Sequence, residues 1–465
     1  MHSFVRGGLL AATALVATGA LATTAEATPA DTAPQVIDNE SQGDVIIVTG
    51  TQRVRAEAID GQARAGANAS DQLLETRTVV RVAWRHNRVR LVTELQDSRA
   101  WGANPGTPRS TSEVNALEPV QAYVQADLGA VLGRGTSVNL QAGRFTIELG
   151  SRRLLAADDY RNTVSSYTGL RADVAIPGGV KAAALYVLPL ARLPDDGPAL
   201  RANVAALDKE SFSVVLWGGF LARQRSGSPW LADAIFLHLG ERDWPGHATR
   251  DRSLNTLGVR FLREPRAANF DGGVETIYQW GQISASAAPG AARQAVSASF
   301  VRIHAGYRFA GPWQPRVLFE LDRASGDGAG PTFGRFDPLF GMRRVDLAPS
   351  GLYNAIGRTN LFSPGVRVEV TPSRRVDAFV GYRGLWLADR QDAFSSTGVR
   401  DPSGRSGNFA GHQLDARLRW WLVLRRLRFE ADAVFLAKGR FLREAPNAPP
   451  GRTTRYGSLN LTASF

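Results

Sequence analysis

The chain has 465 residues, 44% of them hydrophobic, with a formal net charge of +12 and no cysteine. The missing thiols exclude disulfide frameworks, cysteine zinc sites, iron–sulfur clusters and cysteine nucleophiles. Lys181, Lys209 and Lys438 are the only lysines among 55 basic residues, so 52 are arginines. Arginine keeps its charge in any surroundings and binds carboxylates or phosphates through a rigid fork of N–H donors.

Residues 1–27 have the pattern of a secretory signal peptide. Arg6 supplies a positive charge, residues 9–22 are apolar, and Ala25-Glu26-Ala27 forms a cleavage site of small residues. No later apolar run reaches 18 residues, so no transmembrane helix is expected. Residues 28–50, which begin with a stretch rich in Thr, Ala and Pro, are expected to form a flexible periplasmic arm.

From residue 51 to 465 the chain is built of segments of about ten residues that alternate apolar and polar side chains. Leu414 and Leu418 share one face of an expected strand, for example, while Arg417 and Arg419 share the other. The polar faces are crowded with arginines and acids, unlike the mixed polar face of a soluble β-sandwich. An apolar outside and a polar inside are typical of strands that cross a bilayer. The pattern predicts an all-β fold, a transmembrane antiparallel β-barrel.

The count of expected strands is about 18, and the connections between them alternate between short and long. Short periplasmic turns and long extracellular loops are typical of outer-membrane barrels, and an even count places both termini in the periplasm. The connection 221–231 is longer than this pattern favours. The expected strands lie near 53–59, 76–84, 88–96, 119–128, 137–144, 167–176, 180–188, 211–220, 232–239, 254–262, 270–281, 296–309, 314–322, 358–371, 376–387, 412–422, 427–436 and 455–465.

Aromatic residues mark the ends of several expected strands. The last strand ends on Phe465, which resembles the signal that the outer-membrane barrel-assembly machinery recognises. Other aromatic residues near strand ends fit the belts found at membrane interfaces. They are Trp84, Trp280, Tyr382, Trp386, Trp420 and Trp421.

Several stretches of the chain resemble the alginate-export family of outer-membrane porins. They are NALEPVQAYV from Asn115, AGRFTIELGSRRL from Ala142, YRNTVSSYTGLRADV from Tyr160, the stretch from Phe336 to Val368, DPSGRSGNFAGHQLDARLR from Asp401 and GRFLREAPNAP from Gly439. The resemblance runs over most of the chain from about Arg53. It implies an 18-stranded barrel in the bacterial outer membrane with an arginine-rich channel for a polyuronate.

Moving a polyanion through a narrow pore requires fixed positive charge at the constriction, moderated by acids so that binding stays weak. Any single arginine could instead brace the wall through a salt bridge. The residues expected to line the pore lie at lumen-facing positions or in the family motifs. They are Arg81, Arg90, Arg144, Arg152, Arg153, Arg161, Arg171, Arg302, Arg358, Arg367, Arg383, Arg417 and Arg419, with the acids Glu94, Asp173, Glu369 and Asp415.

The expected function is passive passage of an anionic polysaccharide or oligosaccharide, with no catalytic residue, no metal and no cofactor. The five histidines of the mature chain show no metal-ligand spacing, and a G-x-S-x-G elbow is missing. The expected partners are the saccharide, outer-membrane lipid and lipopolysaccharide, the assembly machinery and a periplasmic secretion protein, but no nucleic acid. Arg374, Arg375, Arg425 and Arg426 are expected to meet lipid headgroups.

Three alternatives remain open from the sequence. The barrel could be a porin that takes up a small anionic nutrient. Uptake could be energy-coupled, because residues 44–50, DVIIVTG, resemble a TonB box, although the sequence leaves no room for a plug domain. Finally, the long loops could carry a binding function, with the lumen closed by segments 97–118 and 323–357.

Overall fold

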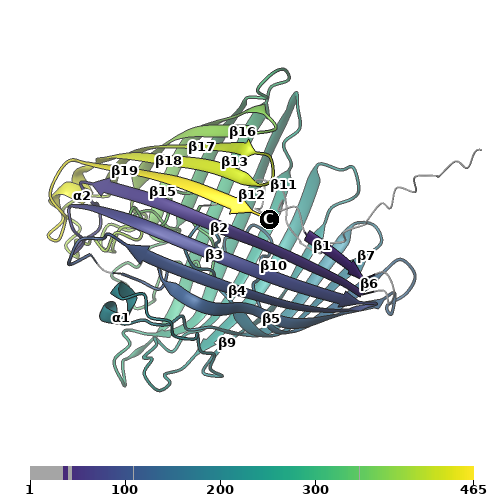
Figure 1. Ribbon diagram of the computed structural model, residues 1–465. Helices are drawn as coiled ribbons and strands as arrows, with labels where there is room; N and C mark the ends of the chain where they lie inside the picture. The colour runs from purple at the N-terminus through teal and green to yellow at the C-terminus, as the bar shows by residue number, and fades with distance from the viewer. Residues whose placement is uncertain (1–34, 40–43, 108, 345) are drawn as a thin grey trace, which may run out of the picture.

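The computed structural model describes residues 35–39, 44–107, 109–344 and 346–465. Strands β2 to β19 pair consecutively and antiparallel, and β19 pairs with β2, so that eighteen strands close into a barrel (Figure 1). This confirms the predicted fold and strand number. The strands are β2 Asp44–Asp60, β3 Ser70–His86, β4 Val89–Trp101, β5 Asn115–Gly129, β6 Ser137–Phe145, β7 Tyr167–Ile176, β8 Val180–Pro189, β9 Val214–Arg223, β10 Trp230–Glu241, β11 Ser253–Arg263, β12 Asn269–Ser284, β13 Arg293–Arg308, β14 Arg316–Ala324, β15 Leu361–Ser373, β16 Val376–Trp386, β17 Phe409–Val423, β18 Leu427–Lys438 and β19 Thr453–Ser464.

The outer surface of the barrel is apolar because alternate residues of each strand point outward. On β19, Leu459 is 57% exposed, whereas its neighbours Ser458 and Asn460 are 2% and 4% exposed. The same alternation places Leu74 and Leu414 on the outside. A band of this kind is stable only in contact with lipid, so the barrel crosses a bilayer with its polar residues inside. In the described part of the chain, no helix combines the length and apolar character that a membrane span needs.

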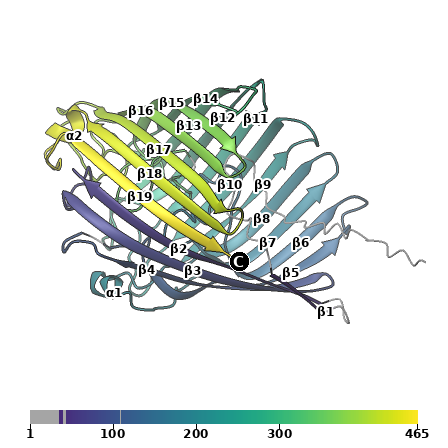
Figure 2. The same ribbon diagram turned by 45° about the horizontal axis from the view of Figure 1, so that its top comes forward.

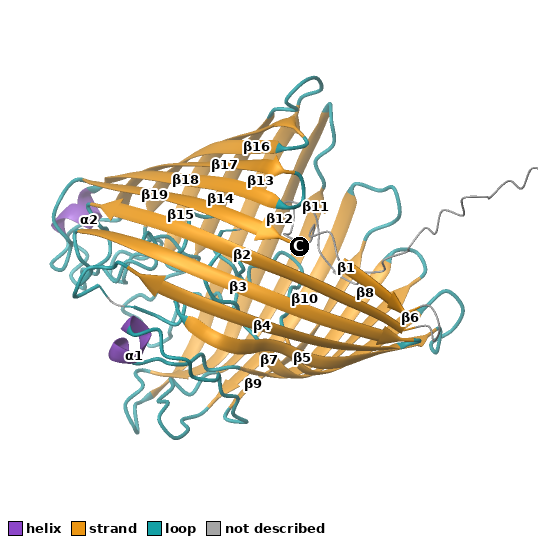
Figure 3. Cartoon of the chain, viewed as in Figure 1, coloured by secondary structure: helices purple, strands orange, loops and turns teal. Residues whose placement is uncertain are grey.

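Short turns gather at one end of the barrel and long loops at the other (Figure 2). The longest loops connect β14 to β15 and β8 to β9; two short helices, α1 Gly197–Arg201 and α2 Arg440–Glu444, lie in loops of this end (Figure 3). Strand β9 begins three residues later than its predicted start at 211 and ends three residues later than its predicted end at 220, and β10 begins at Trp230, before its predicted start at 232. The turn from β9 to β10 therefore spans only residues 224–229, and the long connection predicted at 221–231 was wrong.

The barrel closes where the last residue of the chain meets β2. The N–H of Gly50 donates to the carbonyl of Phe465, and the N–H of Phe465 donates to the carbonyl of Gly50, both at 3.0 Å. The Phe465 ring lies 2.2 Å from the position that a Cβ atom at residue 50 would occupy. Glycine is therefore the residue that leaves room for the terminal aromatic ring at this seam.

Two parts of the expected flexible arm are strands. Gln35–Asn39 form β1, which pairs with Asp44–Val48 of β2 on the edge that β19 leaves open. Residues 44–50 also pair with β3, so the segment that resembles a TonB box continues directly into the barrel wall. The expected signal peptide, residues 1–27, lies outside the described residues.

Two loops enter the barrel from the loop end and pack inside it. We call residues 146–166 the first lumen loop and residues 325–360 the second lumen loop. The two loops pair with each other through backbone hydrogen bonds. The N–H of Phe340 donates to the carbonyl of Leu154 at 3.0 Å, and the N–H of Met342 donates to the carbonyl of Arg152 at 2.9 Å. In one of the open alternatives, segment 97–118 closes the lumen together with 323–357. It comprises the end of β4, a loop and the start of β5, whereas the two lumen loops are 146–166 and 325–360.

The lumen is not polar all round, which corrects the expectation drawn from the alternation. Most inward residues of β8 to β12 toward the loop end are apolar and belong to one buried cluster with the two lumen loops, although Thr256 and Gln279 there are polar. We call this part of the wall the apolar sector. Its members are Leu185, Val187, Leu216, Phe220, Leu237, Leu239, Leu254 and Ile277. The inward faces of β13 to β19, β2 and β3 carry most of the buried arginines, and we call them the arginine sector.

Candidate functional site

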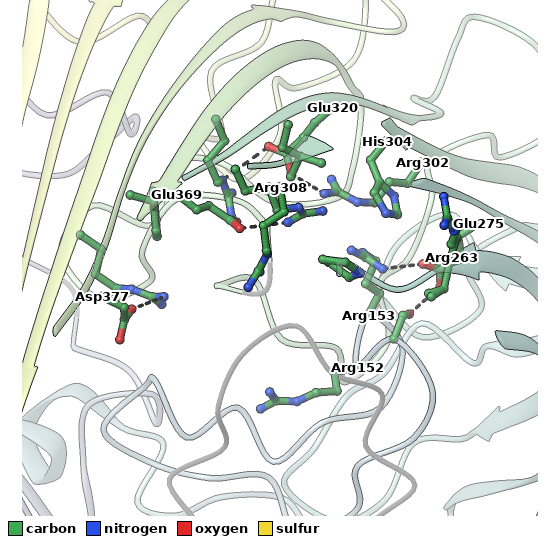
Figure 4. Close-up of a pocket in the computed structure, with 18 of the residues that line it drawn as sticks. Arg152, Arg153, Arg263, Glu275, Arg302, His304, Arg308, Glu320, Glu369 and Asp377 are labelled. Atoms are coloured by element: carbon green, nitrogen blue, oxygen red, sulfur yellow. Dashed lines mark hydrogen bonds and ion pairs between the residues drawn. The ribbon is translucent and has the colours of Figure 1, made fainter. Parts of the chain in front are cut away.

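A cavity of about 380 Å³ lies inside the barrel on the turn-end side of the lumen loops. Its rim includes Arg263, Arg308 and Asp377, which flank the short turns, and its inner end includes Arg153 and Arg302 (Figure 4). Ten arginines and five carboxylates line it, an excess of five positive charges. The arginines are Arg152, Arg153, Arg260, Arg263, Arg302, Arg308, Arg316, Arg367, Arg417 and Arg419, and the acids are Glu148, Glu275, Glu320, Glu369 and Asp377.

Strand alternation places most of these side chains in the cavity. On β11, Val259 and Phe261 are exposed on the outer face, so Arg260 between them points inward. On β14, Arg316, Glu320 and other alternate residues are buried, whereas Phe319 is exposed. The positive lining therefore follows from the pleat of the strands and requires no special backbone geometry.

The inner end of the cavity is a dense network of charges. Arg302 Nη1 lies 2.8 Å from both carboxylate oxygens of Asp322, and its Nη2 donates to Glu320. Arg383 donates to Glu320 Oε2 at 2.6 Å and to Asp322 Oδ2 at 2.8 Å. Arg367 completes the group, with its Nε 3.6 Å from Glu320. Buried carboxylates and arginines that satisfy one another hold this part of the lumen rigid.

Nearly half of the predicted pore arginines line the cavity itself. They are Arg152, Arg153, Arg302, Arg367, Arg417 and Arg419, together with the predicted acid Glu369. Arg152 pairs with Glu148 at 2.7 Å, Arg419 pairs with Asp377 at 2.9 Å, and Glu369 pairs with Arg316 at 2.9 Å. Their role in substrate passage stays a prediction.

Two predicted arginines belong to the network just beyond the cavity. Arg383 binds Glu320 and Asp322, as described above. Arg358 donates to Asp346 and, at 2.6 Å, to the carbonyl of Met342. The predicted acid Asp415 lies 3.5 Å from Arg344 Nη1, a residue of the second lumen loop.

The remaining predicted residues do not line the cavity and form local pairs elsewhere. Arg81 lies 3.7 Å from Glu94, and Arg171 lies 2.7 Å from Asp173 on the same strand. Arg90 is the cross-strand partner of Gln125.

Arg144 and Arg161 brace structures at the loop end. Arg144 pairs with Glu118 and, at 3.0 Å, with Glu210, which joins β5 and β6 to the loop before β9. Arg161 pairs with Asp158 at 2.8 Å within the first lumen loop.

Sequence reasoning missed several charged residues of the site. Arg260, Arg316, Glu320 and Asp322 occupy inward positions of alternating strands, and the same alternation used elsewhere identifies them. Asp346 lies in a long loop with no periodic pattern, and nothing in the sequence points to its position in the lumen.

Two arginines on the loop-end side of the lumen loops are desolvated. Burial, together with the nearby charge of Arg161, lowers the pKa of Arg192 to about 9. Burial likewise lowers the pKa of Arg343 to about 10, with Asp158 opposing the shift and Arg161 adding to it. Among the described residues, the Nη1 atom of Arg343 has no hydrogen-bond partner.

Comparison with known proteins identifies the family. The family profile described as alginate export matches residues 45–454, which is most of the chain. Curated protein sequences give no match.

Solved structures of outer-membrane porins share the fold. OccK2 (OpdF) of Pseudomonas aeruginosa, solved in complex with glucuronate, has a TM-score of 0.55 at 10% identity, covering 90% of this chain and 96% of its own. A BenF-like porin from Pseudomonas fluorescens Pf-5 has a TM-score of 0.57 at 10% identity, covering 90% and 98%. OccAB1 of Acinetobacter baumannii has a TM-score of 0.56 at 10% identity, covering 90% and 96%. At such low identity the likeness shows the fold alone. With its lipid-facing band and its closed eighteen-stranded barrel, the chain belongs to the alginate export family and is a channel protein of the bacterial outer membrane.

Proposed function

We propose that the channel gives passive passage to an anionic polysaccharide or oligosaccharide, such as a polyuronate. The observation that carries this proposal is the cavity, in which ten arginines face five carboxylates. Its volume of about 380 Å³ falls in the range of small-molecule sites, so a few sugar units fit at a time.

The arrangement suits a substrate that carries one carboxylate per sugar. A low-dielectric wall focuses the field of the unbalanced arginines into the lumen and raises the local concentration of anions. The interleaved acids keep each contact weak, which a moving chain requires. The desolvated Arg192 and Arg343 extend positive charge to the other side of the lumen loops.

The test is the ion selectivity of the purified protein in planar bilayers. We expect a reversal potential that shows anion preference, and a current that oligouronates block and neutral oligosaccharides of the same length do not. Replacing two rim arginines, as R263Q/R308Q, removes two of the five excess charges and leaves the buried network intact. The affinity for the uronate should fall about tenfold at low salt and less at high salt, because salt screens charges near solvent.

The matched control is R374Q/R375Q, which removes the same charge from the turn between β15 and β16. These residues do not line the cavity, so the affinity should stay within about twofold of the parent value at moderate salt, where distant charges are screened. Cation preference of the parent channel, or equal effects of the two double variants, would contradict the proposal.

A second candidate is a porin that takes up a small anionic nutrient. The size of the cavity supports it, and the structurally similar OccK2 was solved with glucuronate, a single uronic acid. Block by a monomeric uronate as strong as block by its oligomer would favour this alternative. The position of residues 44–50 within β2 gives no support to energy-coupled uptake, because the segment pairs on both edges.

A further inference from the structure

Asp346, in the second lumen loop, is bound by five arginines. Its carboxylate accepts from Arg302 at 3.0 Å and Arg153 at 3.2 Å, and it also pairs with Arg358. Its backbone carbonyl accepts from Arg367 and Arg383. The residue is only 2% exposed. We call these five arginines the carboxylate socket.

The socket borders the cavity directly. Arg153 and Arg302 line the inner end of the cavity (Figure 4), as does Arg367. The same three guanidinium groups also bind Asp346. Arginine offers several N–H donors in a fork that fits any carboxylate. A carboxylate that reaches the inner end of the cavity therefore meets groups already arranged to bind its chemical class.

Asp346 supplies one of four carboxylates that nearly balance the five arginines of the socket. The five arginines face Glu275, Glu320, Asp322 and Asp346. Without the Asp346 carboxylate, five buried positive charges would face three negative ones, so the site favours an incoming anion. An oligouronate in the cavity can satisfy this requirement in place of the loop.

The two lumen loops are held by different contacts. The first lumen loop is fixed to β2 and β3 by Arg53, Arg55 and Arg77, which donate to its backbone carbonyls at 2.6–3.3 Å. Asp346 links the second lumen loop to β13, β15 and β16 and to Arg153 of the first. The second loop is held on either side of Asp346 as well, because Arg344 donates to Asp432 and the N–H of Leu352 donates to Glu57 at 2.8 Å. Loss of the Asp346 contacts would therefore free only the segment around Asp346, between these two contacts, and leave the first loop in place.

We propose that Asp346 is an internal carboxylate ligand that holds the second lumen loop across the lumen, and that the carboxylate of an anionic saccharide arriving from the cavity displaces it. Displacement releases the segment around Asp346 and widens the path. The contact between Asp346 and the socket stands by itself, whereas the identity of the displacing ligand rests on the proposed function. The site is thus a carboxylate-binding site that the closed channel fills with its own side chain.

The experiment measures how fast a cysteine in the second lumen loop is labelled. Ser350 is 4% exposed and lies four residues beyond Asp346. Because the chain has no native cysteine, S350C gives one thiol of nearly the same size. Its reaction with N-ethylmaleimide is followed in lipid vesicles, with and without an oligouronate, in the parent and in D346N.

We expect the labelling rate to rise about tenfold when the oligouronate is added, and by a similar factor in D346N without it, as is usual for a coupling between ligand and conformation. A neutral oligosaccharide should leave the rate unchanged. D346E, which keeps the charge, should label at close to the parent rate. E94Q removes one carboxylate that neither lines the cavity nor touches the loop, and its rate should equal that of the parent.

Equal labelling rates in D346N and the parent would overturn the proposal. Heat-modifiable migration in gels must show that both proteins are folded. If D346N labels fast and the oligouronate blocks current without accelerating labelling, displacement is wrong and the proposed function survives. If D346N labels fast but the oligouronate neither blocks nor accelerates, the proposed function fails, and only the anchoring role of Asp346 stands.

Discussion

The apolar sector and the arginine sector of the lumen wall hold the same two loops by different means. In the apolar sector, residues such as Phe220 and Leu237 pack against the lumen loops in one hydrophobic cluster. In the arginine sector, Arg53 and Arg55 donate to loop carbonyls, and Arg302 binds a loop carboxylate. The first kind of contact is non-directional, whereas the second fixes individual atoms.

The difference shows that arginines in a channel have two separate uses. Arg55 is 2% exposed, and its donors are occupied by Tyr160, Asn460 and Glu75. Such a group stabilises the folded barrel and is not accessible to a substrate. Arg302 also binds carboxylates, but it lines the cavity and remains within reach of a ligand. The number of arginines in the lumen is therefore larger than the number that a transported substrate can reach.

The largest effect is expected from removing a purely structural arginine. R55M leaves the buried carboxylates of Glu57 and Glu75 without their shared partner, 3.5 Å and 3.4 Å away in the parent. We expect a loss of about 3–5 kcal/mol in the free energy of unfolding, as found for broken buried ion pairs. Denaturant unfolding in lipid vesicles, followed by tryptophan fluorescence, measures it.

The control for this prediction is R55M/E75Q. E75Q removes one of the two carboxylates that R55M leaves without a partner. Part of the lost stability should return, because fewer unpaired charges are then buried. A double variant as unstable as R55M, or an R55M barrel as stable as the parent, would show that this pair does not act as the structure indicates.

A smaller loss of stability is expected in the apolar sector. Leu237 has no exposed surface and belongs to the cluster that packs on the lumen loops. L237A should cost about 2–5 kcal/mol, through lost burial and the cavity left behind. Anion selectivity in bilayers should stay unchanged, because no charge moves. A shift in selectivity comparable to that of the R263Q/R308Q variant would mean that the two sectors are not separate.

The smallest effect on stability is expected from Arg419, at the turn end of the arginine sector. It pairs with Asp377, whose side chain is 32% exposed. R419Q should change the free energy of unfolding by at most about 1 kcal/mol, because partly exposed pairs contribute little. Uronate block should nevertheless weaken, since a positive charge leaves the cavity lining. Reduced stability with unaltered block would place Arg419 with the structural arginines instead.

Much of the barrel could be predicted from local pattern. The alternation around Leu414 and Arg417 identified β17 and its two faces, and the terminal Phe465 marked the last strand. The apolar sector was not predicted, although β8 carries a signal for it: Leu185 and Val187 face inward while Tyr186 faces outward, so both faces are apolar. Apolar residues on both faces indicate burial on both sides, which an empty lumen cannot provide.

The sequence by itself determined the class of fold, the outward apolar band, the inward position of most arginines and the family. These follow from a period of two residues, which each strand expresses locally. Only the tertiary structure decided which arginines share a cavity, which ones hold the lumen loops, and that Asp346 lies among five of them. Closing the barrel and folding the loops inward bring together residues from β2 to β19, and no spacing along the chain encodes those distances.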